Sequence, residues 1–209
     1  MELRAGLHRV KYPDFVVDQL PHRKQMRRRE VPSGVRFVTF SCQNRLPLLR
    51  NEKIARLFVA SLARARAELG FVLFAWVVMP EHVHLLCRPP EGMTLDRVLV
   101  RLKMTVARRV LARWKEMNAP ILTRLHDATG RSRFWLKGGG FDRNVRDDAE
   151  FSREVRYIHR NPVERGLVDN PQDWPWSSIR WWMGLKEGEL ECDPPPGRPG
   201  SWELWKGYA

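Results

Sequence analysis

Two histidines separated by one apolar residue are the part of the sequence best suited to chemistry. His82 and His84 lie in the stretch AWVVMPEHVHLLC, where an apolar segment is followed by a proline turn and then by the histidines. Side chains alternate between faces along a β-strand, so both imidazoles would leave one face while Val83 enters the core. Such a pair is either half of a divalent metal site or two surface residues of a half-buried strand.

A tyrosine and an asparagine on a later helix could complete a metal site. Tyr157 and Asn161 are four residues apart, so their side chains project from one face of a helix, beside its apolar stripe. If this helix packs on the sheet, it can hold both groups over the histidine strand. Asn161 would then supply an oxygen ligand and Tyr157 a nucleophile, whereas a tyrosine in such a place is more often a packing residue.

These groups together suit the cleavage of a phosphodiester. A divalent cation on a phosphate oxygen withdraws charge and orients the ester for attack. A phenol ordinarily titrates at about pH 10, so Tyr157 needs activation by the metal or by a cation such as Arg153 or Arg160, each about one helical turn away. Histidine with an amide oxygen and water suits Mn²⁺ or Mg²⁺ better than structural zinc.

The surrounding chain predicts alternating strands and helices that would position this site. Apolar and β-branched runs predict strands at residues 35–42, 71–79 and 82–88, and helical periodicity predicts helices at residues 51–69, 94–117 and 147 to about 160. Asn161-Pro162 should end or kink the third helix. Residues 120–140 read as a connector, and its three glycines suit either a hinge or a close approach to a ligand.

Composition restricts the class of protein. The 209 residues, 43% of them hydrophobic, suit one domain with extensions. Lys and Arg number 37 against 24 Asp and Glu, giving a net charge of +13, which favours nucleic acid as a partner over a membrane surface. Three cysteines without a CxxC motif predict a reducing compartment, and the absence of a secretory or membrane segment predicts a cytoplasmic protein.

The two ends differ from the predicted domain at residues 34–180. Residues 1–33 form a basic arm, and residues 181–209 form a tail rich in tryptophan and proline, with tryptophans that could stack on unpaired bases but more often cover a core. We expect DNA contacts from basic residues of the arm, the second and third helices and the segment between them. These candidates are Arg23, Lys24, Arg27, Arg28, Arg29, Arg101, Arg108, Lys137, Arg143, Arg153 and Arg160.

Two long motifs make the chain resemble a known family. The motifs are WVVMPEHVHLL and FDRNVRDDAEFSREVRYIHRNPVERGLVDNPQDWPWSS, and over residues 34–180 they resemble the REP-associated tyrosine transposases, a branch of the single-tyrosine HUH superfamily. The resemblance implies an α+β, ferredoxin-like antiparallel sheet with helices packed on one face. It also implies that His82, His84 and Asn161 bind the metal and that Tyr157 is the catalytic nucleophile.

The activity implied by this resemblance is cutting and rejoining of single-stranded DNA beside imperfect palindromic hairpins. A 5′-phosphotyrosine intermediate and a divalent metal, Mg²⁺ or Mn²⁺, would be used, with a DNA hairpin as partner, no membrane and no small-molecule substrate. The family usually has asparagine before the first histidine, whereas this chain has Glu81. The motifs leave open whether the chain is a monomer or a homodimer and whether its active site forms within one chain.

Two other functions compete with this reading. Histidine-triad nucleotide hydrolases carry His-x-His-x-His on a strand, but the third position here is Leu86, which argues against that class. A non-catalytic hairpin-binding protein of the same fold, acting on DNA or RNA, would use the basic arm and the tryptophans equally well. Four intact candidate site residues favour the enzyme.

Overall fold

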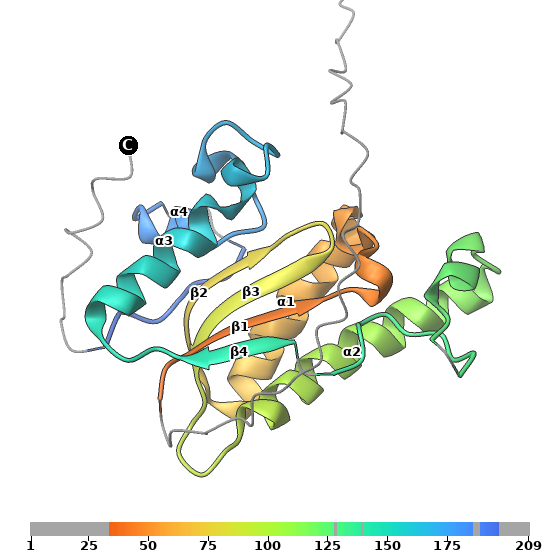
Figure 1. The fold of residues 1–209 in the computed structure, drawn as a ribbon, viewed down its shortest axis with the longest axis horizontal. Helices are drawn as coiled ribbons and strands as arrows, with labels where there is room; N and C mark the ends of the chain where they lie inside the picture. The colour runs from red at the N-terminus through yellow and green to blue at the C-terminus, as the bar shows by residue number, and fades with distance from the viewer. Residues whose placement is uncertain (1–33, 128, 139, 186–188, 197–209) are drawn as a thin grey trace, which may run out of the picture.

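The fold is built on one antiparallel sheet. The computed structural model describes residues 34–127, 129–138, 140–185 and 189–196. In these residues four strands pair in the order β2-β3-β1-β4 (Figure 1), namely β1 Arg36–Ser41, β2 Val72–Val78, β3 His82–Arg88 and β4 Phe141–Asn144. The helices are α1 Glu52–Leu69, α2 Leu95–Glu116, α3 Asp148–Glu164 and α4 Ile179–Trp182. This β1-α1-β2-β3-α2-β4 order, followed by α3 and α4, confirms the predicted α+β, ferredoxin-like fold.

The two faces of the sheet carry separate apolar cores. One core joins the sheet to α1 and α2, which cover the same face, and Val83 and Leu85 of β3 point into it. The other core joins the sheet to α3 through residues such as Leu86 and Phe37. The sequence predicted helices on one face, and this holds for α1 and α2 (Figure 1), while α3 covers the opposite face. By alternation along β3, that opposite face is the one to which His82 and His84 belong.

The helix boundaries follow their capping residues. The Asn51 side chain accepts hydrogen bonds from the N–H groups of Lys53 and Ile54 at the start of α1, and Gly70 ends it with φ of 68°. Asp147 accepts from the Glu150 N–H at 2.7 Å and starts α3 as predicted. None of the described helices combines the length and apolar character needed to cross a bilayer.

Helix α3 continues past the predicted end near residue 160. Pro162 lies inside the helix, and the chain remains helical to Glu164. A proline lacks an N–H, but so near the C-terminus its loss affects one backbone hydrogen bond, and the Arg165 N–H still reaches the Asn161 carbonyl at 3.1 Å. The extra turn keeps Asn161 within the helix.

Strand β4 is an element that the sequence pattern missed. Its residues, FDRN, lack apolar alternation, so periodicity gives no strand signal. The strand is held by antiparallel pairing with β1 and by a buried ion pair between Arg36 and Asp142. Gly140 precedes it with φ of 78°, and a Cβ on this residue would lie 1.9 Å from the Thr39 carbonyl oxygen. The glycine therefore permits a close approach to β1.

The tryptophan-rich segment closes the outer edge of β2. The Val78 N–H donates to the Trp176 carbonyl at 2.8 Å, and the Ser178 N–H donates to the Trp76 carbonyl at 3.0 Å. Further along the same edge, the Asp193 N–H donates to the Leu73 carbonyl at 2.7 Å. Edge strands with unpaired backbone groups are prone to aggregation, so these segments protect the sheet. Trp176 and Trp182 are buried, which fits a core role better than base stacking.

His159 fastens α3 to this edge segment. Its side chain is fully buried, and its Nε2 lies 2.9 Å from the Ser178 hydroxyl, which in turn accepts the Trp76 N–H. Burial lowers the pKa of His159 to about 3, because charging it inside the core is unfavourable. The imidazole therefore stays neutral in the folded protein at neutral pH.

We predict that His159 makes the fold acid-sensitive. The unfolded chain binds a proton at this position below about pH 6.5 while the folded chain does not until about pH 3, so stability falls as pH drops across that interval. His159→Gln keeps a polar group near Ser178 without titrating. From pH 7 to pH 5 the variant should lose about 2 kcal/mol less free energy of unfolding than the parent, measured by urea denaturation. Equal losses in both proteins would contradict this.

We predict that Gly140 and Gly138 differ sharply in their tolerance of a side chain. Both have positive φ, but a Cβ on Gly138 meets nothing within 4 Å. Gly138→Ala should therefore cost only the backbone term, about 1–2 kcal/mol. Gly140→Ala must also displace β1 and should cost about 1–3 kcal/mol more in thermal or urea unfolding. If both variants unfolded alike, the close contact with Thr39 would be wrong.

Candidate active site

The two histidines direct one nitrogen each toward a common point. His82 and His84 leave the same face of β3, and their Nε2 atoms lie 2.9 Å apart. Their rings meet nearly at right angles, with centroids 4.6 Å apart. Both residues are more than nine-tenths buried. Two imidazole lone pairs repel at this distance unless a proton or a cation lies between them.

The outer nitrogens of both rings have polar partners. His82 Nδ1 lies 3.0 Å from Glu81 Oε1, and His84 Nδ1 lies 2.7 Å from the Thr39 hydroxyl. An ionised carboxylate can only accept, so the Glu81 contact requires a proton on His82 Nδ1. Partners of this kind fix the tautomer and the ring plane of metal-binding histidines. The arrangement therefore leaves the Nε2 atoms to face the site.

The charges around the histidines have clear physical causes. Burial and, to a lesser extent, the nearby His82 lower the pKa of His84 to about 3, so His84 is neutral at neutral pH. For Glu81, burial acts to raise the pKa, but the hydrogen bond with His82 and the charge of Arg165 lower it to about 2. The Arg165 Nη2 donates to Glu81 Oε1 at 2.8 Å. Glu81 is therefore an ionised carboxylate held between a histidine and an arginine.

Tyr157 lies directly against the histidine pair. Its ring centroid is 5.2 Å from that of His84 and 5.9 Å from that of Phe37, in edge-to-face contacts. Phe37 also stacks on His84, with ring centroids 5.5 Å apart, so the three rings contact one another. Tyr157 nevertheless remains 40% exposed, unlike the histidines. The structure thus brings together β3 and α3, the two elements predicted to form the site. Tyr157 lies on the solvent side.

Asn161 occupies the helix position between two contacts with the histidine strand. One turn before it, Tyr157 touches His84, and one residue past the end of α3, Arg165 pairs with Glu81. Asn161 is 5% exposed, and its Oδ1 has no hydrogen-bond partner among the described residues. A buried amide oxygen without a partner is costly, so this atom suits a ligand. Tyr157, Asn161 and Arg165 follow one another at four-residue spacing along one side of α3 and its C-terminal cap.

The donor set fits a hard divalent cation. Mg²⁺ prefers octahedral coordination at about 2.1 Å, which places neighbouring ligand atoms about 3.0 Å apart, close to the spacing of the two Nε2 atoms. Among the described residues no group of three or more His, Cys, Asp or Glu side chains could hold a metal. A third protein ligand would therefore be an amide such as Asn161, with water or substrate oxygens completing the shell.

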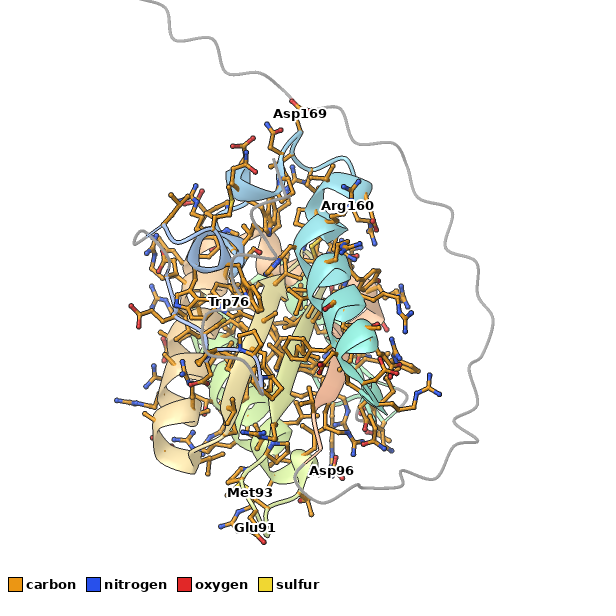
Figure 2. All side chains as sticks on the ribbon, turned by 90° about the vertical axis from the view of Figure 1, so that its left-hand side faces the viewer. Trp76, Glu91, Met93, Asp96, Arg160 and Asp169 are labelled. Atoms are coloured by element: carbon orange, nitrogen blue, oxygen red, sulfur yellow. The ribbon has the colours of Figure 1, made fainter. Side chains whose placement is uncertain are left out.

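The predicted DNA contacts separate into distinct environments. On α3, Arg153 and Arg160 are exposed near Tyr157; Figure 2 shows Arg160 at the surface, and its Nε lies 3.8 Å from Glu164. Arg101 and Arg108 are on α2, over the opposite face of the sheet, where Arg101 pairs with Glu68 at 2.6 Å. Lys137 is exposed. The arm residues Arg23, Lys24, Arg27, Arg28 and Arg29 lie outside the described residues.

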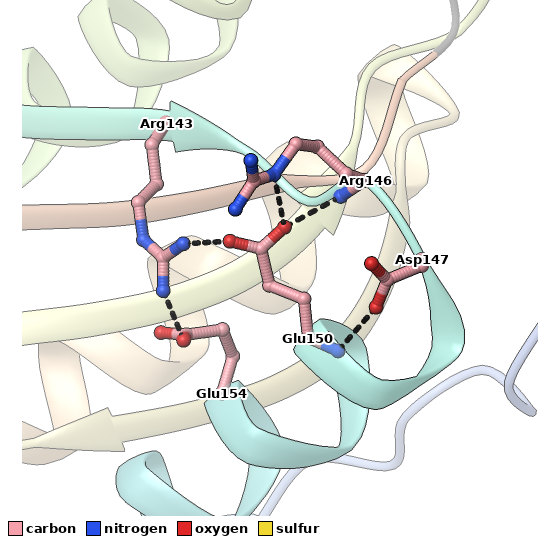
Figure 3. A network of polar contacts seen from close by, with 5 residues as sticks. All are labelled: Arg143, Arg146, Asp147, Glu150 and Glu154. Carbon is pink, nitrogen blue, oxygen red and sulfur yellow. Dashed lines mark hydrogen bonds and ion pairs between the residues drawn. The ribbon is translucent and has the colours of Figure 1, made fainter.

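Arg143 has a structural partner set of its own. Its guanidinium pairs with both Glu150 and Glu154 of α3 (Figure 3) and lies 5.7 Å over the Phe37 ring. Both carboxylates are nearly fully buried, so the arginine balances their charge and ties β4 to α3. This contact gives Arg143 a structural role beside the site, while 34% of its side chain remains exposed.

Sequence reasoning did not identify two supporting residues. Thr39 lies opposite His84 in the pairing of β1 with β3, and Arg165 follows α3, where it reaches Glu81. Neither residue belongs to a motif that signals its role, because both depend on strand register and helix placement. The available signal was Glu81 itself, since a carboxylate beside a histidine in a buried turn needs a positive partner.

Comparison with known proteins finds similar transposases. The family model for IS200-like transposases matches residues 35–135. The REP-associated tyrosine transposase of Escherichia coli (strain K12) is 27% identical over 155 residues, which cover 74% of this chain and 82% of that protein. A putative REP-associated tyrosine transposase of Haemophilus influenzae is 27% identical over 156 residues, covering 73% and 84%.

A solved structure shares the fold. It is a REP-associated tyrosine transposase bound to a REP hairpin, and it aligns with a TM-score of 0.61 over 85% of this chain and 96% of its own, at 19% identity. The resemblance read from the motifs is thus confirmed: this chain is similar in sequence to REP-associated tyrosine transposases and shares the fold of one of them.

Proposed function

We propose that the protein is a metal-dependent endonuclease and strand transferase for single-stranded DNA. It would act beside imperfect palindromic hairpins and pass through a 5′-phosphotyrosine. The observation that carries the proposal is the contact of an exposed tyrosine, Tyr157, with a buried histidine pair whose Nε2 atoms converge. A related transposase described as bound to a REP hairpin supports the choice of DNA ligand.

In the proposed reaction, Tyr157 Oη attacks the scissile phosphorus. The new bond joins this oxygen to phosphorus, the bond from phosphorus to the 3′ oxygen breaks, and that oxygen takes up a proton to leave a free 3′-hydroxyl. A later attack by a 3′-hydroxyl on the phosphotyrosine reverses the exchange and rejoins DNA without an external energy source. The phenolic proton passes to water before the attack, and water supplies the proton that the leaving 3′ oxygen takes up.

The residues of the chain prepare this step in three ways. His82, His84 and Asn161 would hold the divalent ion, which when bound polarises a phosphate oxygen. Contacts with His84 and Phe37 hold one side of the Tyr157 ring. The exposed side of the ring stays open to substrate. The exposed arginines of α3 would attract the DNA backbone.

We predict that Tyr157→Phe abolishes covalent protein–DNA adducts. The phenyl ring keeps its packing against His84, so the variant should fold and bind a labelled hairpin oligonucleotide within about twofold of the parent. Denaturing gels would show adducts for the parent and none for the variant. The chain has three tyrosines, so Tyr12→Phe and Tyr208→Phe are matched controls that should retain adducts.

The outcomes separate the candidate functions. Adducts that survive Tyr157→Phe would remove Tyr157 from the nucleophilic role. If the unaltered protein bound the hairpin tightly but never cut it in Mg²⁺ or Mn²⁺, a non-catalytic hairpin-binding protein would be the better description.

We predict that His82→Ala and His84→Ala weaken metal binding and cleavage together. Each substitution removes one Nε2 donor, so the Mn²⁺ concentration for half-maximal cleavage should rise more than about tenfold. Calorimetric titration with Mn²⁺ should show the same loss without DNA. His126→Ala removes an exposed imidazole elsewhere and should change neither quantity. A double variant that kept full Mn²⁺-stimulated cutting would refute the metal assignment.

A further inference from the structure

Glu81 lies where the histidine strand meets the end of the nucleophile helix. Its Oε1 contacts His82 Nδ1 at 3.0 Å and accepts a hydrogen bond from Arg165 Nη2 at 2.8 Å. The first partner belongs to β3, and the second follows α3. A single carboxylate oxygen is therefore shared between the two elements that build the candidate active site.

The backbone around Glu81 is held firmly. Its carbonyl accepts the Cys42 N–H at 2.8 Å, and the carbonyl of Pro80 accepts the Leu49 N–H at 2.9 Å. The turn itself is closed by the Met79 N–H, which donates to the His82 carbonyl at 2.8 Å. Glu81 is 9% exposed. The backbone of Glu81 is thus held in place, so its carboxylate can fix the positions of His82 and Arg165.

Glu81 is poorly placed to be a metal ligand itself. It contacts Nδ1 of His82, whereas the nitrogen that faces His84 is Nε2, on the other side of the ring. The same carboxylate oxygen is already engaged by Arg165. Carboxylates in this position characteristically orient a metal-binding histidine and fix which nitrogen carries the proton.

We propose that Glu81 is a positioning residue that sets the tautomer of His82 and anchors the end of α3 through Arg165. The metal part of this inference rests on the proposed function. The carboxylate keeps the proton of His82 on Nδ1, which leaves Nε2 as the donor atom toward His84. The Arg165 contact holds α3, with Asn161 and Tyr157, at a defined distance from His82. Glu81 thereby connects β3, which carries the histidines, to α3, which carries Tyr157.

The first test measures the tautomer of His82 directly. Two-dimensional ¹H–¹⁵N spectra of metal-free, DNA-free protein should show His82 with its proton on Nδ1. Glu81→Gln retains an acceptor oxygen and should keep this pattern. Glu81→Leu is close in size but has no acceptor, and His82 should shift toward a proton on Nε2. An unchanged His82 pattern in Glu81→Leu would overturn the proposal.

The second test measures the consequence for metal binding. Calorimetry with Mn²⁺ alone should show affinity about 10–100-fold weaker for Glu81→Leu and within a few-fold of the parent for Glu81→Gln. Arg165→Met removes the other partner. It should leave the His82 tautomer intact but weaken the nuclear Overhauser contact between the Tyr157 and His84 rings. If Arg165→Met left that contact unchanged, the anchoring role would be refuted.

These results are distinguishable from failure of the proposed function. The tautomer and the ring contact are read without metal or DNA, so they test Glu81 even if the protein never cleaves a hairpin. Conversely, the protein could form Tyr157 adducts while the parent, Glu81→Gln and Glu81→Leu all show the same His82 tautomer and the same Mn²⁺ affinity. That result would leave the proposed function intact and refute the role of Glu81. If Glu81→Leu does not fold, Glu81→Gln and Arg165→Met still decide: a His82 proton moved to Nε2 in Glu81→Gln would refute the tautomer role.

Discussion

The docking of α3 on the second face of the sheet is the constraint on which the site depends. An apolar stripe of α3, including Phe151, Val155 and Ile158, packs against the sheet residues of that face. Beside this stripe Tyr157 touches His84, and just past the end of α3 Arg165 pairs with Glu81. Without this interface the histidines would be a polar pair on an uncovered strand, and the tyrosine an exposed side chain on a helix.

Ion pairs and a buried hydrogen bond support this interface at its edges. Arg143 of β4 bridges the buried carboxylates Glu150 and Glu154, which ties the start of α3 to the edge of the sheet (Figure 3). His159 joins the middle of the helix to Ser178 and so to the outer edge of β2. Buried charges and polar groups are costly unless each has its partner, so these contacts restrict α3 to one placement. Rigid placement is what a site needs when a nucleophile must meet a reacting atom closely.

Much of this arrangement was readable from the sequence because it follows from short-range rules. Alternation along a strand put His82 and His84 on one face, helical spacing put Tyr157 and Asn161 on another, and Asn51 and Asp147 marked helix starts. Strand β4 was not predicted because its stability comes from pairing with β1 and from the Arg36–Asp142 ion pair, which leave no local sequence pattern. The role of Thr39 was not predicted because strand register places it opposite His84. The role of Arg165 was not predicted because the extra turn of α3 brings it to Glu81. The roles of Tyr157, Asn161 and the two histidines remain predictions that the geometry supports.

The central claim is that a tyrosine from the late helix attacks DNA held at the early histidine strand. The most direct measurement is mass spectrometry of the protein after reaction with a hairpin oligonucleotide and digestion with trypsin. The account predicts an oligonucleotide joined through a 5′-phosphate to the peptide of residues 157–160, on Tyr157. An adduct on Tyr12 or Tyr208, or cleavage that yields a free 5′-phosphate with no adduct, would contradict it.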